Sequence, residues 1–148
     1  MTEFEVKVKK LDDKAIVPTY GTAFSAGADL YACIDEKVTI KENETVMIHT
    51  GISVEIPQGF GGFVFARSSL GCKRGLAPAN KVGVIDSDYR GEIMVGLHNH
   101  SGKTQEIEVG ERIAQMVILP YASAKFVLAD ELTDTERGSG GFGSTGKK

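Results

Sequence analysis

Apolar and polar residues alternate along several short stretches of the chain. Every second residue is apolar in residues 4–8 and 52–56, and residues 61–66 and 113–119 are largely apolar. Alternation with a period of two is typical of β-strands that bury one face. Glycine, proline and asparagine separate the stretches, as expected for turns. The pattern predicts an all-β sandwich or closed barrel, with further strands at residues 38–40, 45–48, 107–109 and 126–128.

Helical periodicity is weak by comparison. No stretch of helical length carries apolar residues at a clean 3.6-residue period. The best candidate for a single helical turn is residues 68–74, directly after the strand that ends at Ala66. We therefore expect no parallel sheet and no Rossmann-type nucleotide site.

A polar turn at residues 86–91 separates two apolar stretches, residues 82–85 and 93–97. The alternation on both sides predicts a β-hairpin that Gly91 closes. The turn contains two carboxylates, a tyrosine and an arginine within five residues. Loops held by a rigid sheet often carry function, although aspartate and serine are also ordinary turn formers. The turn is therefore a candidate site.

Composition narrows the class of protein. The 148 residues with 41% hydrophobic content predict one domain with a real core. The two cysteines, Cys33 and Cys72, argue against a disulfide framework or a zinc cluster. A net charge of −3 argues against general nucleic-acid binding. A small phosphate-bearing ligand remains compatible with this charge.

The first residues alternate charged and apolar side chains, which is unlike a signal peptide. The longest purely apolar run, residues 116–119, is far too short to span a membrane. We therefore expect a cytoplasmic protein without a membrane segment.

The chain changes character after Leu132. Five glycines fall within residues 138–146, and such a stretch loses much backbone entropy when it is ordered. We expect a mobile arm at residues 133–148, following a β-domain at residues 1–132. The arm nevertheless contains Phe142, which favours a role in closing on a ligand. Residues 141–147 superficially fit a phosphate-binding P-loop, but no helix can follow them before the chain ends.

The Arg67-Ser68-Ser69 segment lies where the strand passes into the helical turn. Free N–H groups at such a junction, with a planar guanidinium beside them, suit phosphate oxygens. The alternative is a plain serine cap of the helical turn.

Five separated segments together resemble one family. They are residues 26–32 (AGADLYA), 66–71 (ARSSLG), 83–93 (GVIDSDYRGEI) with Asn80 ahead of it, 110–116 (GERIAQM) and 137–146 (RGSGGFGSTG). In this order they resemble the trimeric dUTPases, which hydrolyse deoxyuridine triphosphate.

The resemblance implies a jelly-roll-like β-barrel subunit with a flexible C-terminal arm. It also implies a homotrimer whose active sites are shared between subunits, the arm of one copy capping the site of a neighbour. The implied reaction converts dUTP and water to dUMP and pyrophosphate with Mg²⁺ on the triphosphate. This would keep uracil out of DNA and supply dUMP for thymidylate synthesis.

The resemblance also implies a role for each site residue. Asp86 would activate the attacking water, and Asp29 would hold the Mg²⁺ complex through metal-bound water. Tyr89 would lie under the deoxyribose and exclude a 2′-hydroxyl. The uracil would be bound by Asn80, Gly83, Val84 and Phe142, and the phosphates by Arg67, Ser68, Ser69, Gln115, Arg137, Ser144 and Thr145.

Two alternatives remain open. A dCTP deaminase has the same fold and an Arg-Ser-Ser segment, but its catalytic glutamate would stand where this chain has Gly96. A non-catalytic nucleotide-binding module would be expected to lack Asp86 or Phe142, and both are present.

Overall fold

The structure is a computed structural model that describes residues 4–141. Within that range the chain forms twelve short strands and one helical turn. No helix among the described residues is long and apolar enough to cross a membrane. The elements, in chain order, are β1 (Lys7–Lys10), β2 (Thr19–Tyr20), β3 (Ala28–Tyr31), β4 (Val38–Ile40), β5 (Thr45–His49), β6 (Ile52–Glu55), β7 (Phe60–Phe65), α1 (Ser68–Gly71), β8 (Leu76–Pro78), β9 (Gly83–Ile85), β10 (Met94–Asn99), β11 (Gln105–Ile107) and β12 (Arg112–Pro120).

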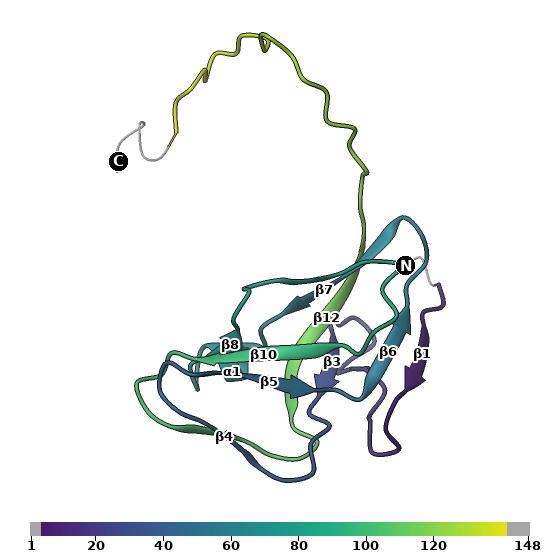
Figure 1. Ribbon diagram of the computed structural model, residues 1–148, viewed down its shortest axis with the longest axis vertical. Coiled ribbons are helices and arrows are strands. Elements are labelled where there is room, and N and C mark those ends of the chain that lie inside the picture. The colour runs from purple at the N-terminus through teal and green to yellow at the C-terminus, as the bar shows by residue number, and fades with distance from the viewer. Residues whose placement is uncertain (1–3, 142–148) are drawn as a thin grey trace.

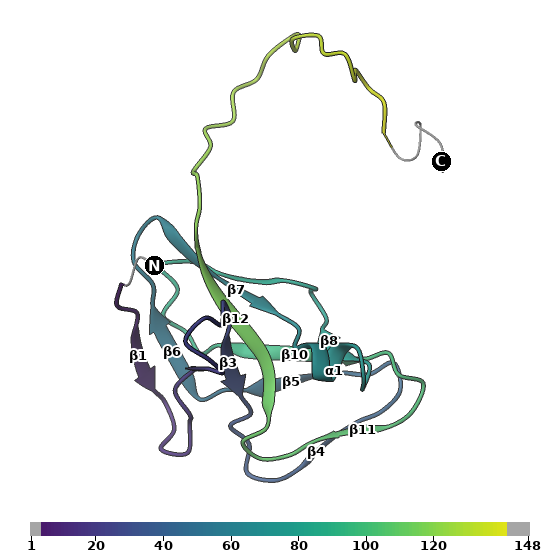
Figure 2. The same cartoon turned by 180° about the vertical axis from the view of Figure 1, so that it is seen from behind.

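The strands form four sheets, and every strand pair among the described residues is antiparallel. The largest has the order β2-β3-β12-β7-β9, a second has the order β5-β10-β8, and β1-β6 and β11-β4 are two-stranded. The five-stranded and three-stranded sheets form the two main faces of the molecule (Figures 1 and 2). The predicted absence of a parallel sheet is confirmed for the described residues.

The core lies between these sheets and follows the predicted alternation. On β5 and β10, Ile48 pairs with Val95, and both are buried, whereas Met47 and Met94 are exposed on the opposite face. Side chains of successive residues on a strand point to opposite faces, so one apolar set fills the interior. The helical turn predicted after Ala66 is also present, because α1 begins at Ser68 and buries Leu70.

The hairpin predicted across residues 83–93 is wrong. β9 pairs with β7, whereas β10 pairs with β5 and β8 in a different sheet. Val84 is 60% exposed and Ile93 is fully buried, so the apolar residues of the two stretches do not share a face. The eight residues between the two strands are also too many for a tight hairpin turn, and they carry the chain from one sheet to the other.

The strand predicted at residues 126–128 is also absent. The last strand ends at Pro120, and residues 121–141 lead away from the β-body (Figure 1). Phe126 and Leu128 are almost completely exposed. An apolar stretch can form a strand only against a partner, and this chain provides none for these residues within the range described. The boundary predicted at residue 132 stays a prediction.

Candidate functional site

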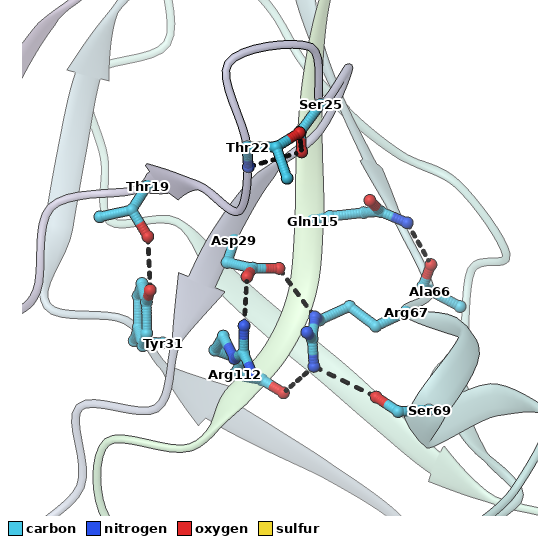
Figure 3. Close-up of polar contacts among 10 residues, drawn as sticks. All are labelled: Thr19, Thr22, Ser25, Asp29, Tyr31, Ala66, Arg67, Ser69, Arg112 and Gln115. Carbon is cyan, nitrogen blue, oxygen red and sulfur yellow. Dashed lines mark hydrogen bonds and ion pairs between the residues drawn. The ribbon is translucent and has the colours of Figure 1, made fainter.

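A buried carboxylate between two arginines is the centre of one group of candidate residues (Figure 3). Asp29 lies on β3, and its side chain is only 12% exposed. Arg67 Nε donates to Asp29 Oδ1 at 2.7 Å, and one terminal nitrogen of Arg112 donates to Oδ2 at 3.2 Å. Both carboxylate oxygens therefore accept a charge-assisted hydrogen bond, which compensates the cost of burying the charge.

Arg67 is held in place by more than this carboxylate. Its terminal nitrogen also donates to Ser69 Oγ at 3.2 Å and lies 3.5 Å from the carbonyl oxygen of Arg112. The Arg67 side chain is 19% exposed, whereas Ser68 is exposed on the first turn of α1. The guanidinium is thus oriented before any ligand arrives.

Gln115 joins the same group from β12. Its Nε2 donates to the carbonyl oxygen of Ala66 at 2.9 Å, which ties β12 to the end of β7. A Cβ atom on Gly27 would lie 2.5 Å from Gln115 Oε1, so a larger residue there would require the carboxamide to move. We call Asp29, Arg67, Ser69, Arg112 and Gln115 the Arg67 cluster.

The cluster depends on a bulge that the sequence does not reveal. Arg112 pairs with Tyr31 and Ala114 with Leu30, so β12 contains one extra residue, Ile113. In a regular strand, residues three apart point to opposite faces. The extra residue brings Arg112 and Gln115 to the same side, as bulges near functional sites often do. Sequence reasoning missed Arg112 as a member of the cluster, although it lies inside one of the five family-like segments.

A second group of candidate residues lies at the edge of the five-stranded sheet. β9 has β7 on one side, and its other edge has no partner strand among residues 4–141. Backbone N–H and C=O groups on such an edge are available to a ligand. Val84 and Asn80 are exposed there, whereas Gly83 is buried, and a Cβ on Gly83 would be 3.3 Å from Val64 Cβ.

The loop that follows β9, residues 86–92, is called the Asp86 loop. Asp86 is exposed and lines an open cleft of about 870 Å³ together with Lys7, Gln58 and Tyr121. The Asp86 carbonyl oxygen accepts a hydrogen bond from the Tyr89 amide at 3.1 Å, which closes a turn.

Arg90 and Tyr89 brace this loop from within. Arg90 donates to the carbonyl oxygens of Ser87 at 2.7 Å and Tyr89 at 3.0 Å. The Tyr89 hydroxyl donates to the carbonyl oxygen of Glu92 at 2.9 Å. The loop therefore holds Asp86 and Tyr89 in a defined conformation while leaving the Asp86 carboxylate open to solvent.

The two groups are not adjacent within one chain. Ile85 lies opposite Gly62 on β7, so Asp86 follows at one end of that strand, whereas Arg67 follows its other end. At about 3.3 Å per residue, the two side chains start roughly 15–20 Å apart along the strand direction. One chain therefore brings together the residues of the Arg67 cluster but not Arg67 with Asp86.

Among the arm candidates the structure describes Arg137, which it does not bring to either group. Arg137 is exposed, and its Nε donates locally to the carbonyl oxygen of Gly140 at 2.9 Å. Phe142, Ser144 and Thr145 lie outside the described residues.

The fold and these donors define a class: an antiparallel β protein that gathers arginine, serine and glutamine donors suited to a phosphorylated ligand. Comparison with known proteins identifies the family. The dUTPase family pattern matches residues 13–146. This chain therefore belongs to the dUTPase family, and the predicted resemblance and all-β fold are confirmed.

Individual relatives align with this chain over nearly its whole length. The deoxyuridine 5′-triphosphate nucleotidohydrolase of Desulfitobacterium hafniense (strain DSM 10664 / DCB-2) is 50% identical over 149 aligned residues, covering 99% of each chain. The enzyme of the same name from Hydrogenobaculum sp. (strain Y04AAS1) is 49% identical over 141 residues, covering 95% of this chain and 97% of the relative. The dUTPase of Staphylococcus bacteriophage 80alpha, solved as a G164S mutant with dUpNHpp, superposes with a TM-score of 0.87 at 28% identity, covering 96% of this chain and 98% of that one.

Proposed function

We propose that this protein hydrolyses dUTP to dUMP and pyrophosphate, with water attacking the α-phosphorus. The main support for this proposal is sequence similarity. Over nearly the full length, the chain is about 50% identical to relatives whose names state this reaction. The phage relative bound to dUpNHpp supports a nucleoside triphosphate-like ligand for the same fold. The Arg67 cluster and the Asp86 loop would supply the chemistry.

Asp86 is the proposed general base. It is an exposed carboxylate at the end of the strand that would bind the base, and a carboxylate in this role contributes roughly 10²–10⁴-fold to the rate. Its lone pairs can orient a water molecule and accept the proton as the bond to phosphorus forms. Pyrophosphate then leaves from the opposite side of the α-phosphorus.

The Arg67 cluster is the proposed phosphate site. Arg67, Ser68, Ser69 and Gln115 carry N–H and O–H donors that match phosphate oxygens. The ion pair with Asp29 supports this role, since it orients the Arg67 guanidinium in advance. Donors that need no reorganisation stabilise developing charge most effectively.

The edge of β9 is the proposed nucleoside site. Asn80 and the backbone around Gly83 and Val84 would bind the uracil edge, and a cytosine there would leave buried polar groups unpaired. Tyr89 would lie beneath the deoxyribose, so a ribose hydroxyl would meet its ring.

Magnesium is proposed to arrive with the triphosphate. Among residues 4–141, no group of three or more His, Cys, Asp or Glu side chains is placed to hold a metal ion. Both Asp29 oxygens already accept from arginines, so Asp29 fits a hydrated ion through water and not by direct coordination. Mg²⁺ commonly keeps several waters and takes its other ligands from phosphates. When bound, it would neutralise charge on the phosphates.

The working unit is proposed to be a homotrimer with shared sites. The separation between Asp86 and Arg67 within one chain supports this, because one nucleotide cannot engage both without help from another copy. The exposed apolar residues Phe126, Leu128 and Leu132 support contact with a neighbouring subunit. Residues 133–148 would form the arm of a neighbouring site, with Phe142 on the uracil and Arg137, Ser144 and Thr145 on the outer phosphates. Closure of such an arm would exclude water from the reaction.

This activity would remove dUTP before it enters DNA and supply dUMP for thymidylate synthesis, in the cytoplasm. Deamination of dCTP is disfavoured because Gly96 offers no carboxylate, and a Cβ there would be 3.0 Å from Met47 Sδ. A purely binding role is disfavoured by the presence of Asp86.

A pyrophosphate-release assay tests the proposal. Purified protein should release pyrophosphate from dUTP, slowly or not at all from dCTP, dTTP and UTP, and much more slowly with a chelator in place of Mg²⁺. Ammonia release from dCTP would instead support the deaminase. No release from any of the four nucleotides would support the binding module.

A further inference from the structure

The side chain of Glu92, the last residue of the Asp86 loop, has no role in the site described above. Its side chain is 22% exposed, and it faces the connection between β5 and β6. Glu92 Oε1 accepts a hydrogen bond from the Gly51 amide at 2.8 Å, and Oε2 lies 2.8 Å from His49 Nδ1. A carboxylate can only accept, so the proton of this second bond resides on Nδ1 of His49. Glu92 thus fastens the loop to a neighbouring sheet through two bonds.

The backbone of Glu92 holds the tyrosine of the same loop. Its carbonyl oxygen accepts the hydrogen bond from the Tyr89 hydroxyl at 2.9 Å. Gly91 makes this possible, because a Cβ there would lie 2.4 Å from the Tyr89 hydroxyl oxygen and 2.5 Å from the nearest ring carbon. The Tyr89 ring therefore lies against Gly91, and its orientation depends on where Glu92 is fixed.

The connection that Glu92 binds is itself rigid. Gly51 has φ +66°, and a Cβ on it would come within 2.7 Å of Cys33 Sγ, so its amide is held by close packing. The Thr50 hydroxyl donates to the carbonyl oxygen of Ile93 at 2.5 Å, and the Ile93 amide donates to Ile52 at 2.9 Å. The position of Glu92 is thereby set by the core and not by solvent.

We infer that Glu92 is a positioning residue for sugar selection: its carboxylate fixes the Asp86 loop so that the Tyr89 ring stays where a deoxyribose fits and a ribose does not. This inference rests on the proposed function. Glu92 does not touch the nucleotide, and its effect passes through the loop conformation. Without the anchor, the loop would relax, Tyr89 would yield to a 2′-hydroxyl, and Asp86 would spend less time aligned with the water.

A merely structural role makes a different prediction. Loss of a half-buried hydrogen-bond acceptor would lower thermal stability but would leave the preference for dUTP over UTP unchanged. Sugar selectivity, the ratio of kcat/KM for dUTP to that for UTP, is therefore the decisive quantity.

The experiment measures sugar selectivity and thermal stability in Glu92→Ala, Glu92→Gln and His49→Ala. Glu106→Ala is the matched control, because Glu106 also bonds one side chain, Lys37 at 3.0 Å, but lies on β11 away from the loop. We expect Glu92→Ala to lose at least about tenfold in selectivity, chiefly by gaining activity on UTP relative to dUTP. Glu92→Gln retains an acceptor for Gly51 and should stay within about threefold of the wild type. Glu106→Ala should match the wild type.

The outcomes separate this inference from the proposed function. A wild-type protein that does not hydrolyse dUTP overturns both. A wild-type protein that prefers dUTP, with a folded Glu92→Ala variant of unchanged selectivity, overturns the role of Glu92 alone. If Glu92→Ala does not fold, His49→Ala decides, since it removes one of the two bonds: a selectivity loss of about threefold supports the anchor, and unchanged selectivity overturns it.

Discussion

The Arg67 cluster and the Asp86 loop are held in contrasting ways. Asp29 and Arg67 are largely buried and paired with each other, at the junction of β3, β7 and β12. Asp86 is exposed at the start of its loop. The side chain that ties this loop to the core, Glu92, lies at the other end of the loop. The donors of the Arg67 cluster are therefore already oriented to bind an anion, whereas the Asp86 loop exposes its carboxylate to solvent.

This difference fits the proposed trimer, in which the Arg67 cluster and the Asp86 loop of one site would come from different subunits. Arg67 and Asp86 start roughly 15–20 Å apart along β7, too far to act on neighbouring atoms of one phosphate chain. In the proposed trimer, the Arg67 cluster of one copy would face the Asp86 loop of another, and the two would form one site.

The largest effect is expected at the loop. Asp86→Asn should lower kcat for dUTP by about 10²-fold or more while leaving affinity for a non-hydrolysable dUTP analogue nearly unchanged, because only the proton acceptor is lost. Single-turnover kinetics and calorimetry measure the two quantities. Asp88→Asn, two residues away and also exposed, is the control and should retain most of the activity. Near-wild-type turnover in Asp86→Asn would refute the assignment.

The next largest effect concerns the arm. Ending the chain after Thr135 should lower kcat/KM for dUTP by roughly tenfold or more, because the proposed arm no longer excludes water. The oligomer should persist, since the last strand ends at Pro120. Activity and light scattering of the truncated protein test both statements, with a chain ending after Gly146 as the control. A truncated protein that unfolds would show that these residues are structural.

The last effect is on the stability of the Arg67 cluster and not on turnover. Asp29→Asn leaves two guanidinium groups without their shared carboxylate, and we expect a loss of about 2–3 kcal/mol in the free energy of unfolding, as for other hydrogen bonds to charged groups. Asp35→Asn removes an exposed ion pair with Lys14 and should leave the denaturation midpoint unchanged. Denaturant titrations at equal protein concentration compare the two. Equal midpoints would mean that the buried pair does not stabilise the cluster.

The sequence predicts the local elements of this fold well. Alternation locates β5, β6 and β12, and the polar-to-apolar change after Ala66 locates α1. These features depend on residues close together in the chain, so a local pattern contains enough information. The family-like segments also point to Asp29, Arg67 and Gln115, which the structure brings together.

The remaining features depend on contacts between residues that are far apart in the chain. The alternation around Val84 predicts a strand with a buried face, but Val84 is exposed on the edge strand β9. The pattern therefore does not reveal that β9 pairs with β7. Arg112 joins the cluster through a bulge, and Glu92 acts through the amide of Gly51, 41 residues earlier in the chain. Phe126 and Leu128 alternate as in a strand, yet no strand forms there in a single chain.

Mixing two inactive variants tests the shared site most directly. Asp86→Asn and Arg67→Ala are each expected to have little activity alone. If one subunit supplies Arg67 and another supplies Asp86, co-refolding the two variants in equal amounts should restore about a quarter of the wild-type activity. The reason is that, with random assembly, about one site in four combines an intact Arg67 with an intact Asp86. Activity that stays at the level of the separate variants would contradict a site shared between subunits.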